Sequence, residues 1–207
     1  MTVSVTDKRQ AILDAALKLL ATCGFHGFSM KQLASEAHVA AGTVYLYFKD
    51  RESLIAELHH NILLNFVENV FGEFDTSISL KQQHLSISKR LWQFCLNNRW
   101  ILLSKAQFDH LPMEVLKDQR SNTCTNPLSP LVRLYEQGRV SGQLKPLPDD
   151  VLFSLSMEPF IYLATQQLLG LVDISEAEIH QMMEAVWDAI SQPSPAKDLR
   201  SQNETSY

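Results

Sequence analysis

The stretch 28–54, FSMKQLASEAHVAAGTVYLYFKDRESL, constrains the fold more than any other part of the chain. Its apolar residues recur at helical spacing and predict two short helices, the first after a Ser29 cap and the second beginning near Ala41. The tight turn between them contains His38, at a point where a positive φ is often needed and glycine is the best residue. We therefore predict a helix-turn-helix in which His38 takes the place of glycine.

The second of these helices has a composition that suits nucleic-acid contact. The small residues Ala41, Gly42 and Thr43 let backbone N–H groups come close to a phosphate or a base edge, and Thr43 could also touch a thymine methyl group. The side chains that could reach flanking phosphates are those of Tyr45, Tyr47 and Lys49. Either tyrosine could instead be a core aromatic, and one of the two must lean inward.

The overall charge of −5 opposes nucleic-acid binding only superficially. Residues 1–60 hold six Lys/Arg and six Asp/Glu, whereas residues 61–207 hold twelve and seventeen, so the acidity belongs to the later part. Phosphate attraction depends on local charge, and Lys31, Lys49 and Arg51 lie in or beside the predicted motif. Lys31 and Arg51 could also be idle surface charges. A single module with so small a basic face should bind nucleic acid with modest, non-specific affinity. Specific binding should therefore require two copies of the module.

Composition and motifs exclude several other classes. With 45% hydrophobic and 20% charged residues, the chain is typical of a soluble globular protein. The N-terminus lacks a signal-peptide pattern, and polar residues interrupt the apolar window 151–172, so we expect a cytoplasmic protein without a membrane span. Cys23 and His26 form a single C-x-x-H pair with no second pair, so no metal is expected. No phosphate-binding loop or nucleophile motif is present, so we expect neither an enzyme nor a cofactor.

No strand-type alternation occurs, which predicts an all-α chain of about nine to ten helices. We expect a three-helix module over residues 1–50, a helical bundle over 51–191 and a polar, disordered tail over 192–207. A long helix from Asp50 to about Phe74 should join module and bundle as a rigid lever. Helix 151–169, kinked at Pro159, and helix 175–190 should pair with their copies in a dimer.

The bundle could hold a small apolar or amphipathic effector. Glu158 lies in an apolar run, where a carboxylate must be paired, protonated or facing water, so it could anchor a ligand or serve an Arg or tyrosine as a structural partner. Aromatic and Met side chains at helical spacing could equally be plain core. The candidate pocket residues are Trp92, Phe94, Trp100, Phe108, Met113, Met157, Glu158, Phe160 and Tyr162.

The run from Ile12 to Leu58, with F-S-M-K-Q-L-A followed by A-x-V-A-A-G-T-V-Y-L-Y-F-K-D-R-E-S-L, resembles the DNA-binding domain of the TetR family of transcriptional regulators. In that family a three-helix module is attached to a larger helical domain that dimerises and usually binds a small effector. The family commonly has glycine where this chain has His38. The resemblance implies DNA contacts by Ser29, Lys31, Ala41, Gly42, Thr43, Tyr45, Leu46, Tyr47, Lys49 and Arg51.

The function expected from these features is that of a homodimeric, sequence-specific regulator, most often a repressor in the family it resembles. Two recognition helices would enter successive major grooves about 34 Å apart on a palindromic operator. An effector would change their spacing and release double-stranded DNA. The alternative is a DNA-architectural or protein-interaction regulator whose second domain binds a protein and no small ligand.

Overall fold

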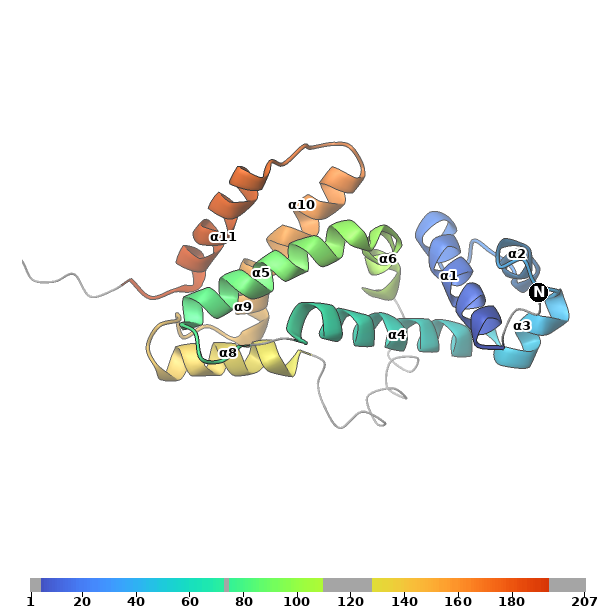
Figure 1. The fold of residues 1–207 in the computed structure, drawn as a ribbon, viewed down its shortest axis with the longest axis horizontal. Helices are drawn as coiled ribbons and strands as arrows, with labels where there is room; N and C mark the ends of the chain where they lie inside the picture. The colour runs from blue at the N-terminus through green and yellow to red at the C-terminus, as the bar shows by residue number, and fades with distance from the viewer. Residues whose placement is uncertain (1–4, 73–74, 110–127, 194–207) are drawn as a thin grey trace, which may run out of the picture.

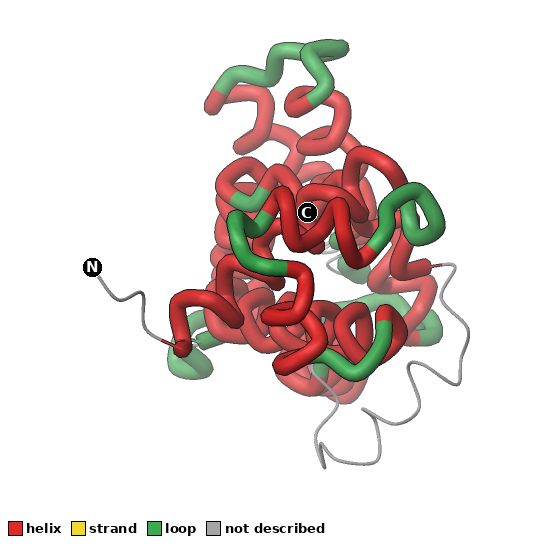
Figure 2. Tube along the Cα trace, turned by 90° about the vertical axis from the view of Figure 1, so that its right-hand side faces the viewer, coloured by secondary structure: helices red, strands yellow, loops and turns green. Residues whose placement is uncertain are grey.

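The computed structural model describes residues 5–72, 75–109 and 128–193 of the 207-residue chain. Ten α-helices lie in these ranges, which contain no strand beyond an isolated bridge between Leu144 and Ser191. Figure 2 looks onto the right-hand end of Figure 1 and shows these helices joined by loops. The predicted all-α fold class is confirmed. None of the described helices is long and apolar enough to cross a lipid bilayer.

A three-helix module forms one end of the molecule (Figure 1). Helix α1 (Val5–Cys23) packs against α2 (Met30–Glu36), and α2 packs against α3 (Ala41–Tyr47). Gly24, at φ +76°, ends α1 in a conformation that glycine adopts without strain. Burying each large apolar side chain contributes about 1.5–3 kcal/mol. The side chains in this core with no more than 1% exposure are Ile12, Ala16, Leu20, Leu33, Val44, Leu54 and Ile55.

Helix α4 (Arg51–Phe71) runs from the module into the rest of the molecule. Asp50 caps it by accepting a 2.8 Å hydrogen bond from the Ser53 N–H, and this bond lowers the pKa of the Asp50 carboxyl. Residues near its start belong to the module core, whereas Val70 and Phe71 belong to a second core. The predicted lever is therefore present from Asp50 to Phe71. Because α4 serves both cores, a domain boundary at residue 50 remains a prediction.

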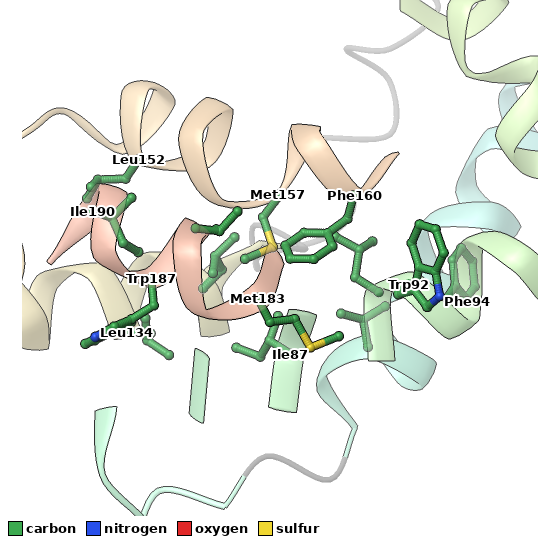
Figure 3. Close-up of a cluster of buried hydrophobic side chains, with 14 of the residues drawn as sticks. Ile87, Trp92, Phe94, Leu134, Leu152, Met157, Phe160, Met183, Trp187 and Ile190 are labelled. Atoms are coloured by element: carbon green, nitrogen blue, oxygen red, sulfur yellow. The ribbon is translucent and has the colours of Figure 1, made fainter. Parts of the chain in front are cut away.

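The second core belongs to a bundle that we call the body. Its helices are α5 (Leu80–Asn97), α6 (Arg99–Asp109), α8 (Ser129–Val140), α9 (Asp149–Ser156), α10 (Glu158–Leu168) and α11 (Glu176–Ile190). Helix α5 packs against α4, α10 and α11, so it is the central element. Figure 3 shows side chains from these helices meeting in the core, among them Ile87, Met157, Phe160, Met183 and Trp187.

The expected single helix over 151–169 is wrong in one respect, because it ends and restarts. Helix α9 ends at Ser156, Met157 lies between at φ −111°, and α10 begins at Glu158. Pro159 lacks an N–H and crowds the carbonyl four residues earlier, but it fits the first turn of a new helix. The position of the disruption was therefore predicted correctly, but the chain forms two separate helices where a kink within one helix was predicted. Ser175 and Glu178 form a capping box at the start of α11.

Candidate nucleic-acid interface

The α2–α3 turn has the predicted conformation. Ser29 and Gln32 form a capping box, in which the Ser29 hydroxyl accepts from the Gln32 N–H at 3.2 Å. His38 has φ +53°, and among the described residues it is the one non-glycine residue with positive φ. The Val39 N–H then donates to the Ala34 carbonyl at 2.9 Å, which closes the turn. Histidine thus occupies the backbone conformation that would favour glycine.

Helix α3 has one buried side and one open side. Val44 is fully buried and Phe48, directly after the helix, is 2% exposed, so these two residues attach α3 to the module core. On the open side Ala41 and Gly42 are exposed, Tyr45 is 58% exposed and Leu46 is 83% exposed. The structure therefore presents these predicted recognition residues on one accessible helix.

The other predicted contact residues differ in accessibility. Ser29, Lys31 and Lys49 are exposed, and Thr43 is half-buried. Tyr47 is half-buried and packs against the module core, so it is the tyrosine that leans inward, whereas Tyr45 points outward. The interface thus keeps two exposed lysines, one near the start of α2 and one after α3.

Arg51 is the exception among the predicted contacts. Its guanidinium donates to the Phe25 carbonyl at 2.8 Å and to the Phe28 carbonyl, and it lies 4.8 Å from the centre of the Phe28 ring. These bonds hold the loop between α1 and α2 against the start of α4. Arg51 therefore positions the loop that leads into α2, because two of its guanidinium nitrogens donate to backbone carbonyls. A DNA contact by Arg51 stays a prediction.

A residue outside the predicted set, Gln107, holds the same loop from the opposite side. Its side-chain Oε1 accepts from the Phe25 N–H at 3.2 Å. Its neighbour Phe108 is 9% exposed in the module core, with its ring centre 5.2 Å from that of His59. Helix α6 therefore docks into the three-helix module, mainly against α1. No sequence signal distinguishes Gln107, since its partner is 82 residues away.

Two parts of the chain match known families. Residues 12–58 match bacterial regulatory proteins of the tetR family, and residues 79–191 match the tetracyclin repressor-like C-terminal domain. An uncharacterized HTH-type transcriptional regulator from Haemophilus influenzae is 32% identical over 186 residues, which cover 89% of this chain and 96% of the relative. The chain belongs to the TetR family.

Solved structures agree with this assignment. A TetR-family regulator from Vibrio parahaemolyticus has a TM-score of 0.74 at 32% identity, and the match covers 90% of this chain and 100% of that protein. One from Haemophilus influenzae has a TM-score of 0.76 at 32% identity, covering 90% and 98%. A relative found by sequence, the fatty acid metabolism regulator protein of Bacillus subtilis, is 25% identical over 167 residues, which cover 80% of this chain and 80% of that protein. This TetR-family protein is accordingly a DNA-binding transcriptional regulator.

The candidate effector-pocket residues of this TetR-family protein are not all gathered in one place. Trp92, Phe94, Met157 and Phe160 lie together in the body core. Phe108 does not join them, because α6 carries it into the module core, and Tyr162 is 63% exposed on α10. Met113 lies outside the described residues. Phe108 and Tyr162 therefore lie apart from the other four residues, since sequence spacing cannot tell which neighbour a helix face meets.

Glu158 has a charged partner. Its carboxylate lies 3.6 Å from the Lys105 ammonium, and both side chains are about 40% exposed. The structure thus favours the structural pairing, with a lysine of α6 where we had expected an arginine or a tyrosine. Burial raises the pKa of the Cys95 thiol to about 12, and the nearby Glu158 carboxylate adds to this effect. The ion pair links α10 to α6, the helix that docks into the module.

Trp100 lines a surface pocket of about 360 Å³ at the junction of α1, the α2–α3 turn and α6. The pocket wall includes Lys18 and Glu36, whose side chains pair at 2.5 Å. The hydrogen bond from Lys18 lowers the pKa of the Glu36 carboxyl. Trp100 thus lines this surface pocket and is not among the buried residues of the body core. Within the described ranges no three His, Cys, Asp or Glu side chains are placed to hold a metal ion.

The body core contains two polar side chains that sequence reasoning missed. His84 and Ser88 are fully buried one turn apart on α5, and within the described residues neither imidazole nitrogen of His84 nor the Ser88 hydroxyl has a hydrogen-bond partner. The His84 ring packs 5.5 Å from that of Trp187. Burial lowers the pKa of His84 to about 4, so the imidazole is neutral at pH 7. Unpaired buried polar atoms are costly, each by about 1–3 kcal/mol.

Proposed function

We propose that this regulator is a cytoplasmic repressor that binds a palindromic operator as a homodimer and is released by a small effector. The observation that most directly supports this proposal is the accessible surface of α3, where Tyr45 and Leu46 point outward while Val44 packs in the module core. A helix held in this way can enter a major groove without moving relative to the module. Exposed Lys31 and Lys49 supply the local positive charge that phosphate binding requires.

The proposed contacts fall into two groups. Residues on the open side of α3 read base edges, and the residues around that side bind phosphates and set the register. We place Arg51 in neither group, because two of its guanidinium nitrogens already donate to backbone carbonyls of the module. The base-reading group is Ala41, Gly42, Thr43 and Leu46, and the phosphate group is Ser29, Lys31, Tyr45, Tyr47 and Lys49.

Lys49→Ala is expected to weaken binding to every DNA sequence, because the lysine contacts phosphate. Each lost phosphate contact reduces the slope of log K against log salt by about 0.9, so a dimer should lose about 1.8. Tyr45→Phe should weaken binding without changing the slope, since it removes a neutral hydroxyl. Fluorescence anisotropy with a labelled duplex at several salt concentrations measures both quantities. An unchanged affinity and slope for Lys49→Ala would refute the phosphate assignment.

Selection of random DNA on the purified full-length protein tests the function as a whole. An enriched palindrome, with half-sites about one helical turn apart, is the expected result. Enrichment of a single half-site would contradict the dimer. Failure to enrich any sequence would contradict sequence-specific binding and favour the alternative, a regulator whose body binds a protein partner.

The proposed dimer interface uses α9, α10 and α11. Large apolar side chains remain exposed on α9, on α10 and in the turn after α10, which is unfavourable for a lone chain. In a symmetric dimer these surfaces would meet their own copies, as in a four-helix bundle. The exposed apolar residues of this region are Val151, Leu155, Tyr162, Leu169, Leu171 and Val172.

The proposed effector site lies in the body along α5. Ser88 and Trp92 are one turn apart on this helix, and His84 extends the same stripe. Together with Met157 and Phe160 they would give an amphipathic molecule apolar contacts and two unsatisfied polar side chains. Because a Bacillus subtilis relative is named a fatty acid metabolism regulator, a fatty acid is the first effector to test.

His84→Leu tests whether these polar atoms are unsatisfied in the free protein. At pH 7 the change should raise the free energy of unfolding by about 1–3 kcal/mol, because leucine has no polar atoms to leave unpaired. The wild type should also lose up to about 3 kcal/mol between pH 6.5 and 4, because the unfolded state takes up a proton that folded His84, with its pKa lowered to about 4, does not. Urea unfolding at several pH values measures both effects. A destabilised variant would show that His84 already has its partners.

Helix α6 is the proposed connection between effector and DNA. It is tied to α10 by the Lys105–Glu158 ion pair and to the module by Gln107 and Phe108. An effector that repacks α5 against α10 would move α6 and, through Phe25, the loop that leads into α2. Release of DNA then follows as a shift between two dimer shapes.

A further inference from the structure

The open side of α3 lacks the side chains that read most bases. Its seven residues, AGTVYLY, include no Arg, Lys, Asn, Gln, Asp or Glu. Guanine is normally read by Arg or Lys, adenine by Asn or Gln, and cytosine by Glu or Asp. Thymine differs, because its C5-methyl group is recognised by apolar contact. The side chains of α3 are therefore better suited to contact thymine than guanine, adenine or cytosine.

Leu46 is the side chain placed to make that contact. At 83% it is the most exposed large apolar side chain among the described residues. A single exposed leucine is ordinary on a protein surface, so exposure alone carries little weight. Here, however, Leu46 lies one helical turn after Gly42, so the two residues share a face of α3.

Gly42 adds an independent observation. Apart from its chain neighbours and the adjoining backbone of α3, a Cβ added at Gly42 would have no described atom within 4 Å, and the φ of Gly42 is not in the left-handed region. Neither packing nor backbone conformation within the protein therefore requires glycine. Glycine in a helix costs up to about 1 kcal/mol relative to alanine. The open space is instead suited to close approach by a partner, and the exposed, positively charged Lys31 and Lys49 favour a partner that is negatively charged.

We propose that Leu46 reads thymine C5-methyl groups in the major groove, with Gly42 allowing the close approach, so that each operator half-site carries thymine opposite α3. The inference rests on the proposed operator binding and adds the chemical identity of the recognised bases. Ala41 and the Thr43 methyl group contribute further apolar surface to the same readout.

The test uses the operator selected by the full-length protein. Replacing one thymine at a time with deoxyuridine removes only the methyl group and keeps base pairing intact. At the position opposite Leu46 the affinity should fall about fourfold per methyl group, from the transfer free energy of one buried carbon. Leu46→Ala should discriminate less between the thymine and uracil operators, because its shorter side chain gives up most of the contact with the methyl group. Leu46→Asn should shift the selected base towards adenine.

Val140→Ala is the matched control, since Val140 is 80% exposed on α8, far from the module, and should leave the uracil effect unchanged. Circular dichroism should show Leu46→Ala folded, because the side chain is not buried. A selected operator that loses no affinity with uracil at any position overturns the thymine reading and leaves operator binding intact. If no DNA is enriched, both proposals fail.

Discussion

Replacing Arg51 with alanine is expected to lower the free energy of unfolding by about 3 kcal/mol or more. The change removes two charge-assisted hydrogen bonds to the Phe25 and Phe28 carbonyls, each worth about 1.5–3 kcal/mol. The loop that enters α2 would loosen, so operator affinity should fall at least tenfold. Because Arg51 does not contact phosphate in this interpretation, the salt dependence of binding should keep its slope. Urea unfolding and salt-dependent anisotropy measure these two effects.

Two variants sharpen this prediction. Arg51→Lys keeps the charge but lacks the planar fork, so it should be nearly as unstable as Arg51→Ala. Lys49→Ala should show the reverse pattern, with ordinary stability and a reduced salt slope, because Lys49 is exposed. If Arg51→Ala were stable and lost about 1.8 from the salt slope, Arg51 would be a phosphate contact after all.

Phe108→Ala is expected to cost about 3–5 kcal/mol, as large-to-small changes of buried aromatics do. The cavity would open in the module core, beside His59, although Phe108 comes from a helix of the body. Hydrogen exchange should therefore accelerate in α1 and in the first half of α4. Loss of this contact should also weaken effector-driven release, because it removes one of the connections between α6 and the module.

Phe160→Ala is the matched control for that change. Phe160 is fully buried in the body core, so its loss should be similarly costly. The accelerated exchange should then appear in α5 and α10, with the module largely protected. If Phe108→Ala instead exposed only body helices to exchange, Phe108 would belong to the body and would return to the effector-pocket candidates.

The DNA-binding module was the most predictable part of the molecule. Ser29 and Asp50 cap their helices through hydrogen bonds within three residues, so the sequence contains both partners. The positive φ at His38 followed from the length of the turn, whatever residue occupied it. The outward direction of Leu46 and the inward direction of Val44 follow from helical periodicity.

The effector pocket was the least predictable part. Trp92, Phe108 and Tyr162 have similar apolar or aromatic character, yet they lie in the body core, in the module core and on the surface respectively. Helical periodicity shows that a face is apolar but does not identify what it packs against. His84 and Ser88 were missed for a different reason, because polar residues are expected on the surface and these two are buried.

The sequence by itself determined the helical fold class, the helix caps, the α2–α3 turn and the recognition face, because these depend on residues close together in the chain. Only the tertiary structure decided the roles of Arg51, Gln107, Phe108 and Glu158. Their partners lie 23–26 residues away for Arg51, 82 for Gln107 and in other helices for the last two. Local geometry follows from short-range hydrogen bonding and sterics, whereas long-range contacts depend on how whole helices pack.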